Sequence, residues 1–184
     1  MLPLRSAVAR ASIARSVPRR AFHASRPALV KVGDTIPDIK LMEDSPGNNV
    51  NLAQELASGK GLIIGVPAAF SPSCSAQHLP GYIKHSALKD AGKVFVVAVN
   101  DPFVTGAWAE TLKGTSGMRF LSDPLAEFTK KLELDFEGVP FFLGPRSKRY
   151  ALVVEDGKVK EAHVEPDNTG VNVSTAEKVL GKAH

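Results

Sequence analysis

Two short apolar runs separated by a helical pattern constrain the fold of this chain most strongly. The runs at residues 61–66 and 93–99 are too short for buried helices and are bounded by glycine, proline and asparagine, which is typical of strands buried on both faces. Between them, Leu79, Tyr82 and Ile83 have the spacing of one helix face. A strand, helix, strand order predicts two parallel strands in one sheet.

The remaining pattern extends this unit into an α/β fold. Further strands are expected at residues 37–41, 50–52, 118–121, 150–155 and 158–164, with a turn at 44–49. Further helices are expected at 52–56, 73–91, 104–112, 124–132 and 174–180. Pro80-Gly81 should kink or interrupt the second of these helices, and Asp123 should cap the fourth. Asp156-Gly157 predicts a tight hairpin, so the sheet should be mixed, with helices on both faces and an antiparallel edge.

The basic net charge of +4 comes from the first part of the chain. Residues 1–29 hold six arginines and no acidic residue, whereas the rest holds 17 basic and 19 acidic residues. The body therefore gives little support to nucleic-acid binding, which needs clustered Lys and Arg. No run of 18 apolar residues occurs, so no membrane-spanning helix and no membrane partner are expected.

The arginine-rich start predicts a mitochondrial targeting segment. Residues 1–30 are rich in Arg, Ala and Ser, and arginines break every apolar stretch long enough for a secretory signal. Residues 20–25 resemble the Arg-x-Phe-x-x-Ser pattern at which matrix presequences are cleaved. We expect residues 1–30 to be a disordered, cleaved transit peptide, and residues 31–184 to be the folded domain in the mitochondrial matrix. A basic tail that merely solvates the terminus is the alternative.

Cys74, the single cysteine, follows the first buried strand at the expected start of a helix. Unpaired backbone N–H groups and the helix dipole at such a start favour a negative charge, and hence the nucleophilic thiolate. The plainer alternative is a small buried hydrophobic side chain. Its polar neighbours Ser71, Ser73, Ser75 and Gln77 favour a site over a core position.

The segment Pro67-x-x-x-Ser71-x-x-Cys74 resembles the Pro-x-x-x-Thr/Ser-x-x-Cys motif of peroxiredoxins, and residues 65–81 are similar to the peroxiredoxin-5 subfamily. The similarity continues through residues 99–104, Trp108, residues 123–124, 149–150 and 164–167. It thus spans nearly the whole chain from residue 31 onward.

The resemblance implies a thioredoxin-like fold and reduction of hydrogen peroxide and alkyl hydroperoxides. By position, Cys74 would attack the peroxide and become a sulfenic acid, Pro67 would shield the sulfur, and the hydroxyl of Ser71 would bond the peroxide. Arg149 would supply positive charge, although an arginine beside Lys148 is by itself more typical of a solvated strand end. The backbone N–H groups of Ser73 and Cys74 would complete the donors.

Recycling should depend on another molecule. A chain with one cysteine cannot form an intramolecular disulfide, so glutathione with glutaredoxin, or thioredoxin, is expected to reduce the sulfenic acid in a 1-Cys mechanism. The resemblance also implies a homodimer with a contact near Phe103. No cofactor is expected, and His78 and His85 lack companions at metal-ligand spacing, so no metal is expected. Ser71 lacks the methyl group of the threonine in most relatives, so its hydroxyl should be less fixed.

Two other functions remain open for a lone cysteine. A cysteine hydrolase would need a general base, for which His78, His85 and His163 are the candidates. A redox-sensing thiol or a chaperone could use the same scaffold, because a fold does not fix a function. A sensor would be oxidised without rapid turnover.

Overall fold

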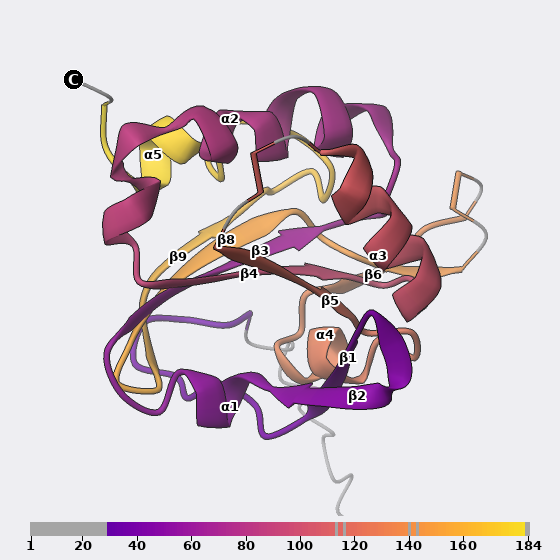
Figure 1. The fold of residues 1–184 in the computed structure, drawn as a ribbon, viewed down its shortest axis with the longest axis horizontal. Helices are drawn as coiled ribbons and strands as arrows, with labels where there is room; N and C mark the ends of the chain where they lie inside the picture. Colours follow the sequence, from indigo (N-terminus) through magenta and orange to yellow (C-terminus); the bar gives the residue numbers. More distant parts are fainter. Residues whose placement is uncertain (1–28, 113, 116, 140, 143, 183–184) are drawn as a thin grey trace, which may run out of the picture.

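A seven-stranded mixed sheet organises the computed structural model, which describes residues 29–112, 114–115, 117–139, 141–142 and 144–182 (Figure 1). Most of the predicted transit peptide, residues 1–28, lies outside these ranges. The strand order is β2-β1-β5-β4-β3-β8-β9, and a separate two-stranded sheet joins β6 to β7. Within the described ranges, no helix is long and apolar enough to cross a membrane.

The elements have the following bounds. The strands are β1 (Lys40–Glu43), β2 (Ser45–Asn51), β3 (Lys60–Val66), β4 (Lys93–Ala98), β5 (Met118–Ser122), β6 (Asp135–Glu137), β7 (Pro145–Ser147), β8 (Tyr150–Glu155) and β9 (Lys158–Val164). The α-helices are α1 (Leu52–Glu55), α2 (Leu79–Lys84), α3 (Pro102–Thr111), α4 (Glu127–Lys131) and α5 (Ala176–Val179). A π-helical turn, η1 (Cys74–His78), precedes α2, and a 3₁₀ turn, η2 (Ser86–Asp90), follows it.

The two apolar runs form β3 and β4, which pair in parallel, and β5 extends the parallel part of the sheet. Antiparallel strands complete both sides, with β8 beside β3 and β1 beside β5. The predicted mixed sheet is therefore confirmed. The helical segments η1, α2 and η2 connect β3 to β4, and α3 connects β4 to β5, because parallel neighbours need a long crossover.

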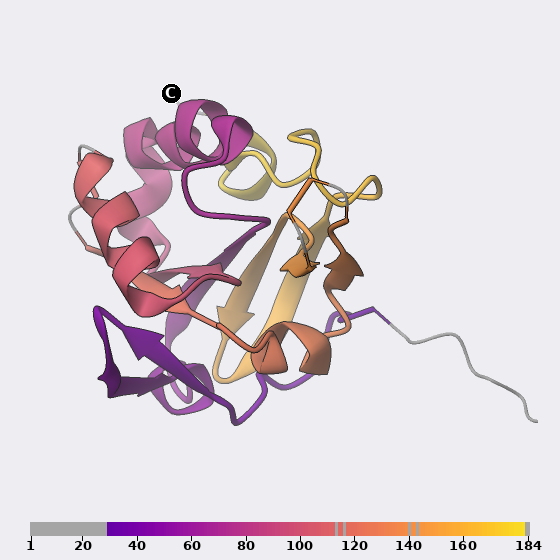
Figure 2. The same cartoon turned by 90° about the vertical axis from the view of Figure 1, so that its right-hand side faces the viewer.

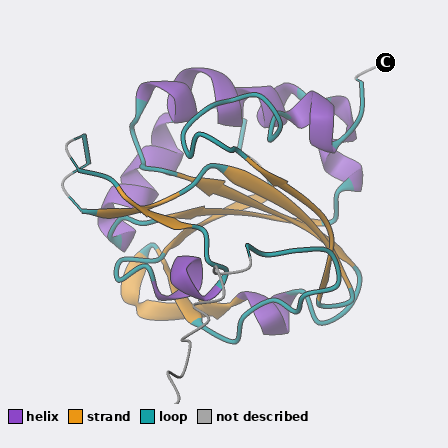
Figure 3. Cartoon of the chain, turned by 180° about the vertical axis from the view of Figure 1, so that it is seen from behind, coloured by secondary structure: helices purple, strands orange, loops and turns teal. Residues whose placement is uncertain are grey.

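Side chains alternate between the two faces of the sheet and divide the core in two. One part packs α1 and α4 against one face and contains Leu52, Ile63, Phe95 and Phe128. The other part packs α2, α3 and α5 against the opposite face and contains Cys74. The two helical layers are visible in Figures 1 and 2, and Figure 3 shows the strands between them.

The β8–β9 hairpin forms around Asp156-Gly157 as predicted. Both residues have positive φ, 50° and 73°, which is the left-handed pairing that a two-residue turn between twisted strands needs. Glycine adopts this conformation without a steric cost, and aspartate tolerates it better than most residues. The turn thereby fixes the pairing of Glu155 with Lys158.

The expected turn at residues 44–49 is wrong, because most of that segment belongs to β2. The reversal is confined to Asp44, whose φ is 60°, and Glu43 pairs directly with Ser45. β2 is an edge strand with mostly exposed side chains. An edge strand accepts Pro46 because the missing N–H need not pair.

The expected interruption near Pro80 takes the form of a change in helix type, because the π-helical turn η1 ends at His78 and α2 begins at Leu79. Pro80 therefore lies at the beginning of α2, where a missing N–H costs little. The helical path breaks a second time at His85, which is extended, with φ −77° and ψ 122°. The predicted helix of residues 73–91 is therefore three consecutive helical pieces.

Two helices are shorter than predicted. α4 begins at Glu127 rather than at residue 124, although Asp123 still caps it through bonds to the N–H groups of Phe128 and Thr129. The intervening residues form a turn with Ala126 at φ 55°. The C-terminal helix is reduced to the single turn of α5.

Candidate active site

Cys74 lies in the first turn of the helical segment that follows β3. The chain leaves β3 at Val66, passes through the loop of residues 67–71 and becomes helical at Pro72. The predicted position of the cysteine at a helix start is therefore confirmed. Its side chain is fully buried, with 0% exposure, so the sulfur is reached only through the groups around it.

Two donors point at the sulfur of Cys74. The hydroxyl of Ser71 donates to Sγ at 2.7 Å, and Nη1 of Arg149 donates to Sγ at 3.2 Å. A thiolate is the form of cysteine that accepts such bonds well, and a bond from a guanidinium to an anion is stronger than one between neutral groups. The arrangement therefore suits a thiolate nucleophile.

Arg149 is part of the buried site and not the solvated strand end that its sequence context alone suggested. It is 1% exposed, and it immediately precedes β8. Its Nε donates to the carbonyl oxygens of Thr169 at 3.1 Å and Gly170 at 2.8 Å, and Nη2 donates to Thr169 O at 3.0 Å. These bonds leave Nη1 directed at the sulfur.

The loop before Cys74 is held in an unusual backbone conformation. Phe70 has a φ of 59°, a left-handed value that costs a bulky residue about 1 kcal/mol or more. The N–H of Ala69 donates to Oδ1 of Asn100 at 2.9 Å, which ties this loop to the end of β4. This anchoring keeps Ser71 in reach of the sulfur. Asn100 lies in residues 99–104, which resemble the peroxiredoxin-5 subfamily, but the sequence did not predict that it anchors this loop.

A pocket of about 360 Å³ lies beside Ser71 and Arg149, the two residues that bond the Cys74 sulfur. It is lined by Pro67, Ser71, Pro72, Ser73, Phe141, Phe142, Arg149 and Thr169. Pro67, Ser71, Ser73 and Arg149, all predicted from the sequence, therefore meet at one place. Because two of them bond Cys74 directly, a small molecule in the pocket lies one side chain away from the sulfur.

The backbone donors predicted near Ser73 and Cys74 lie in the first helical turn. Ser75 N donates to Ser71 O at 3.0 Å, which is the spacing of an α-helical bond. The N–H groups that precede it in a helix have no partner within the helix and are oriented along its axis toward the start. The geometry is compatible with the predicted donor role of these two residues.

The three histidines proposed as general bases have partners other than Cys74. His78 Nε2 lies 2.9 Å from Ser174 O, His85 Nε2 lies 2.9 Å from Gly181 O, and His163 Nε2 lies 2.9 Å from a carboxylate oxygen of Glu161. Within the described ranges, the hydrogen-bond partners of the sulfur are Ser71 and Arg149. The structure gives no support to a cysteine–histidine pair.

His78 is buried beside the site and remains neutral. Burial, together with the positive charge of Arg149, lowers the pKa of His78 to about 4. A neutral imidazole facing a carbonyl carries its proton on Nε2. Tyr82 donates to the same Ser174 oxygen at 2.6 Å, so both side chains tie the helix of Cys74 to the segment around Ser174.

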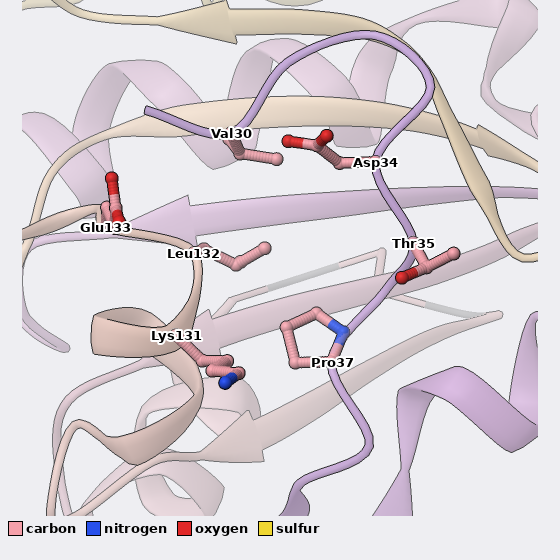
Figure 4. Close-up of a pocket in the computed structure, with 7 residues that line it drawn as sticks. All are labelled: Val30, Asp34, Thr35, Pro37, Lys131, Leu132 and Glu133. Carbon is pink, nitrogen blue, oxygen red and sulfur yellow. The ribbon is translucent and has the colours of Figure 1, made fainter. Parts of the chain in front are cut away.

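A second pocket, of about 250 Å³, lies on the other side of the sheet (Figure 4). It is lined by Val30, Asp34, Thr35, Pro37, Lys131, Leu132 and Glu133. Val30 and Leu132 belong to the core layer opposite that of Cys74. None of the predicted site residues lines this pocket.

Comparison with known proteins gives consistent matches. Residues 31–180 match the family model described as Redoxin. Peroxisomal membrane associated protein 20 of Schizosaccharomyces pombe is 46% identical over 158 residues, which cover 83% of this chain and 98% of that protein. Peroxiredoxin-2C of Oryza sativa subsp. japonica is 38% identical over 159 residues, with coverage of 83% and 98%. The crystal structure of reduced Prx3 in complex with H₂O₂ from Vibrio vulnificus is 34% identical, has a TM-score of 0.74 and covers 83% of this chain and 94% of that one.

Proposed function

We propose, since the chain belongs to the redoxin family and is a peroxiredoxin with a thioredoxin-like fold, that Cys74 reduces hydrogen peroxide and alkyl hydroperoxides and is restored by an external thiol. The observation that carries this proposal is the convergence of Ser71 Oγ and Arg149 Nη1 on the sulfur, since both residues also line a pocket. Peroxiredoxin-type thiol peroxidase activity accounts for both donors.

The reaction proceeds by displacement at oxygen. The Cys74 thiolate attacks one peroxide oxygen, an S–O bond forms, the O–O bond breaks, and the leaving oxygen takes up a proton to become water or an alcohol. Sulfur is oxidised to sulfenic acid as the peroxide is reduced. Ser71 positions the substrate, and Arg149 stabilises negative charge on the separating oxygens. Pro67 keeps bulk water from the sulfur.

Positioning and electrostatics must supply most of the rate. A free thiol with a pKa of about 8.5 is already about a tenth ionised near pH 7.5, so complete ionisation gains only about tenfold, or about 1.4 kcal/mol. Preorganised donors in a site shielded from water gain more, because they need no rearrangement during the reaction. Arg149 is such a donor, since three bonds to Thr169 and Gly170 hold it.

The pocket supports both classes of peroxide. Phe141 and Phe142 line it together with Pro67 and Pro72, so an alkyl group has apolar contacts beside the sulfur. Hydrogen peroxide needs only the polar end of the same pocket. The similar Vibrio protein has been crystallised with that ligand.

The proposed 1-Cys cycle follows from the cysteine count. With a single cysteine, a thiol from another molecule must attack the sulfenic acid, release water and form a mixed disulfide that a second thiol reduces. Glutathione with glutaredoxin, or thioredoxin, is the proposed reductant. Turnover assays with each system in the presence of peroxide distinguish them.

The proposed setting is a homodimer in the mitochondrial matrix. The arginine-rich residues 1–30 support the location, which a fusion of this segment to a fluorescent passenger tests. Phe70, on the loop before Cys74, is 52% exposed, and Phe103, in the first turn of α3, is 65% exposed. The Ala69–Asn100 bond connects the two segments, which supports an apolar contact between copies. Sedimentation of the wild type and of Phe103→Glu tests the dimer.

Stopped-flow oxidation of the chain from residue 31 onward tests the activity. Trp108 is the single tryptophan, and its indole N–H donates to Ser75 Oγ, next to Cys74, at 3.0 Å, so its fluorescence can report oxidation. Cys74→Ser and Arg149→Ala are compared with Arg119→Ala, in which the lost arginine pairs with Glu43 away from the site.

A second-order rate orders of magnitude above that of free cysteine, lost in the first two variants and kept in the control, is the expected result. A wild-type rate near that of free cysteine would refute the peroxidase. Rapid oxidation without turnover with any thiol reductant would favour a redox-sensing thiol.

A further inference from the structure

A buried carboxylate closes the loop that holds Arg149. Glu165 directly follows β9 and is fully buried, with 0% exposure. Its Oε1 accepts hydrogen bonds from three consecutive backbone N–H groups, those of Asn172, Val173 and Ser174, at 2.7, 2.8 and 2.9 Å. The hydroxyl of Ser174 is a fourth donor, at 2.8 Å. This carboxylate therefore fixes the far end of the loop of residues 168–174, here called the arginine loop.

The near end of the arginine loop holds the guanidinium. Carbonyl oxygens of Thr169 and Gly170 accept the three bonds from Nε and Nη2 of Arg149. The backbone is paired as well, with Arg149 N donating to Asn168 O at 2.7 Å and Glu165 N donating to Arg149 O at 3.0 Å. A change in the path of this loop would therefore move the guanidinium.

The same loop is connected to the helix of Cys74. Ser174 O accepts hydrogen bonds from Tyr82 Oη and His78 Nε2, and His78 lies one helical turn after Cys74. Glu165 binds the N–H and the hydroxyl of that same Ser174. The arginine loop thus contacts both groups that must meet for the reaction, the guanidinium on one side and the cysteine helix on the other.

Glu165 acts as an anion in this position. Burial alone would raise the pKa of Glu165, but hydrogen bonds from Ser174, Asn172 and Val173 outweigh burial and lower it. Hydrogen bonds to a carboxylate are about twice as strong as those to a neutral acceptor. A neutral amide of the same shape would therefore hold the loop less firmly without leaving a cavity.

We propose that Glu165 is a positioning residue for peroxide reduction, which holds Nη1 of Arg149 against the Cys74 sulfur by fixing the arginine loop. Glu165 touches neither the sulfur nor the pocket in front of it, and it acts through Arg149. The inference rests on the proposed peroxidase function, because its kinetic consequence is a slower attack on peroxide.

The test compares Glu165→Gln with a control variant that neutralises a buried carboxylate outside the site. In Asp123→Asn, a second buried carboxylate is neutralised, one that accepts bonds from Phe128 N, Thr129 N and Thr129 Oγ at the start of α4. Ser174→Ala is a milder variant that removes one of the four donors to Glu165. Each is measured for its peroxide rate and for its alkylation rate with iodoacetamide, which needs the thiolate but gains nothing from a charge at a breaking O–O bond.

Glu165→Gln is expected to lower the peroxide rate about ten- to a hundredfold, the scale of a small misplacement of a reacting group. The alkylation rate should fall less, and Ser174→Ala should show the same pattern more weakly. Asp123→Asn should lower stability and keep the peroxide rate. In an Arg149→Ala background, Glu165→Gln should add almost nothing, because residues that act through one another are not additive.

An independent readout is the Nε–H signal of Arg149 in a ¹H–¹⁵N spectrum, assigned by its loss in Arg149→Ala. It should be protected from exchange in the wild type and should shift and exchange faster in Glu165→Gln. An unchanged signal, or a rate loss that multiplies with that of Arg149→Ala, would overturn the positioning role. The signal is measured without peroxide, so it tests Glu165 even where the wild-type rate refutes the peroxidase.

Discussion

Acidification from about pH 7.5 to about pH 5 is expected to destabilise the fold through His78. This side chain is 1% exposed, and its Nε2 is committed to Ser174 O. Burial and the nearby charge of Arg149 lower its pKa from 6.5 to about 4. Between these two values the unfolded chain binds a proton that the folded chain does not, so the free energy of unfolding falls as the pH falls.

The size of the effect follows from the two pKa values. At about pH 5 the imidazole is almost fully charged in the unfolded chain and still neutral in the folded one, which corresponds to a loss of about 2 kcal/mol relative to pH 7.5. This loss of stability is absent above about pH 6.5, grows as the pH falls, and is complete near pH 4. Glu165 and Glu55, whose pKa values lie below 4.5, add their own losses only at lower pH.

Urea unfolding at several pH values measures this slope in the wild type and in His78→Gln. The variant should be less stable at neutral pH and should lose about 2 kcal/mol less on acidification. Tyr82→Phe is the control, because it removes the other donor to Ser174 O without removing the histidine. The reasoning is refuted if the difference in stability between wild type and His78→Gln is the same at pH 5 and pH 7.5, or if Tyr82→Phe also flattens the slope.

Three further predictions concern single positions. Ser71→Ala should lower the peroxide rate about ten- to a hundredfold, because it removes a donor to a charged group, whereas Ser71→Thr should keep the rate. Equal stopped-flow rates for the wild type and both variants would contradict this. Gly65→Ala should cost about 3 kcal/mol or lower the yield of folded protein, because a Cβ would overlap the ring of Tyr150, and a thermal midpoint equal to wild type would disprove it. Arg119→Met should cost about 1 kcal/mol through the partly exposed ion pairs with Glu43 and Glu55, with a smaller cost in about 1 M salt. Urea unfolding without that salt dependence would argue against a contribution from these ion pairs.

The parts of the fold that were predictable are those decided by local pattern. Continuous apolar runs gave β3 and β4 because a strand buried on both faces needs apolar side chains in both directions. Asp156-Gly157 gave the hairpin because few residue pairs adopt two left-handed conformations in succession. Each of these signals lies within about seven residues of sequence.

The predicted turn at residues 44–49 failed because an edge position changes the cost of a proline. Pro46 and the glycine that follows predict a turn in isolation, yet an edge strand pairs on one side only and accepts them. Pro80 correctly marks a helix boundary, but the π-helical turn before it has no signal in the local sequence.

The site was predictable only in part. Cys74 at a helix start follows from the pattern, but its contact with Arg149, 75 residues away, was implied only by family resemblance. The anchors of that arginine are backbone carbonyl oxygens, which any residue supplies, so the sequence carries no signal for them. Glu165 lies in residues 164–167, which resemble the peroxiredoxin-5 subfamily, but its bonds to residues 172–174 depend on a loop path that only the structure shows.

The β8–β9 hairpin makes the number of residues between Arg149 and Glu165 important for the site. Arg149 immediately precedes β8 and Glu165 immediately follows β9, and the pairing of Tyr150 with Val164 aligns them. A deletion of one residue in a regularly paired part of either arm, away from the register shift at Val153 and Val154, would turn every following side chain to the opposite face. It would carry Arg149 or Glu165 away from the other. Substitutions along the arms leave the alignment intact as long as the pairing survives. The two strands therefore constrain the number of codons between Arg149 and Glu165 as much as the amino acids that those codons encode.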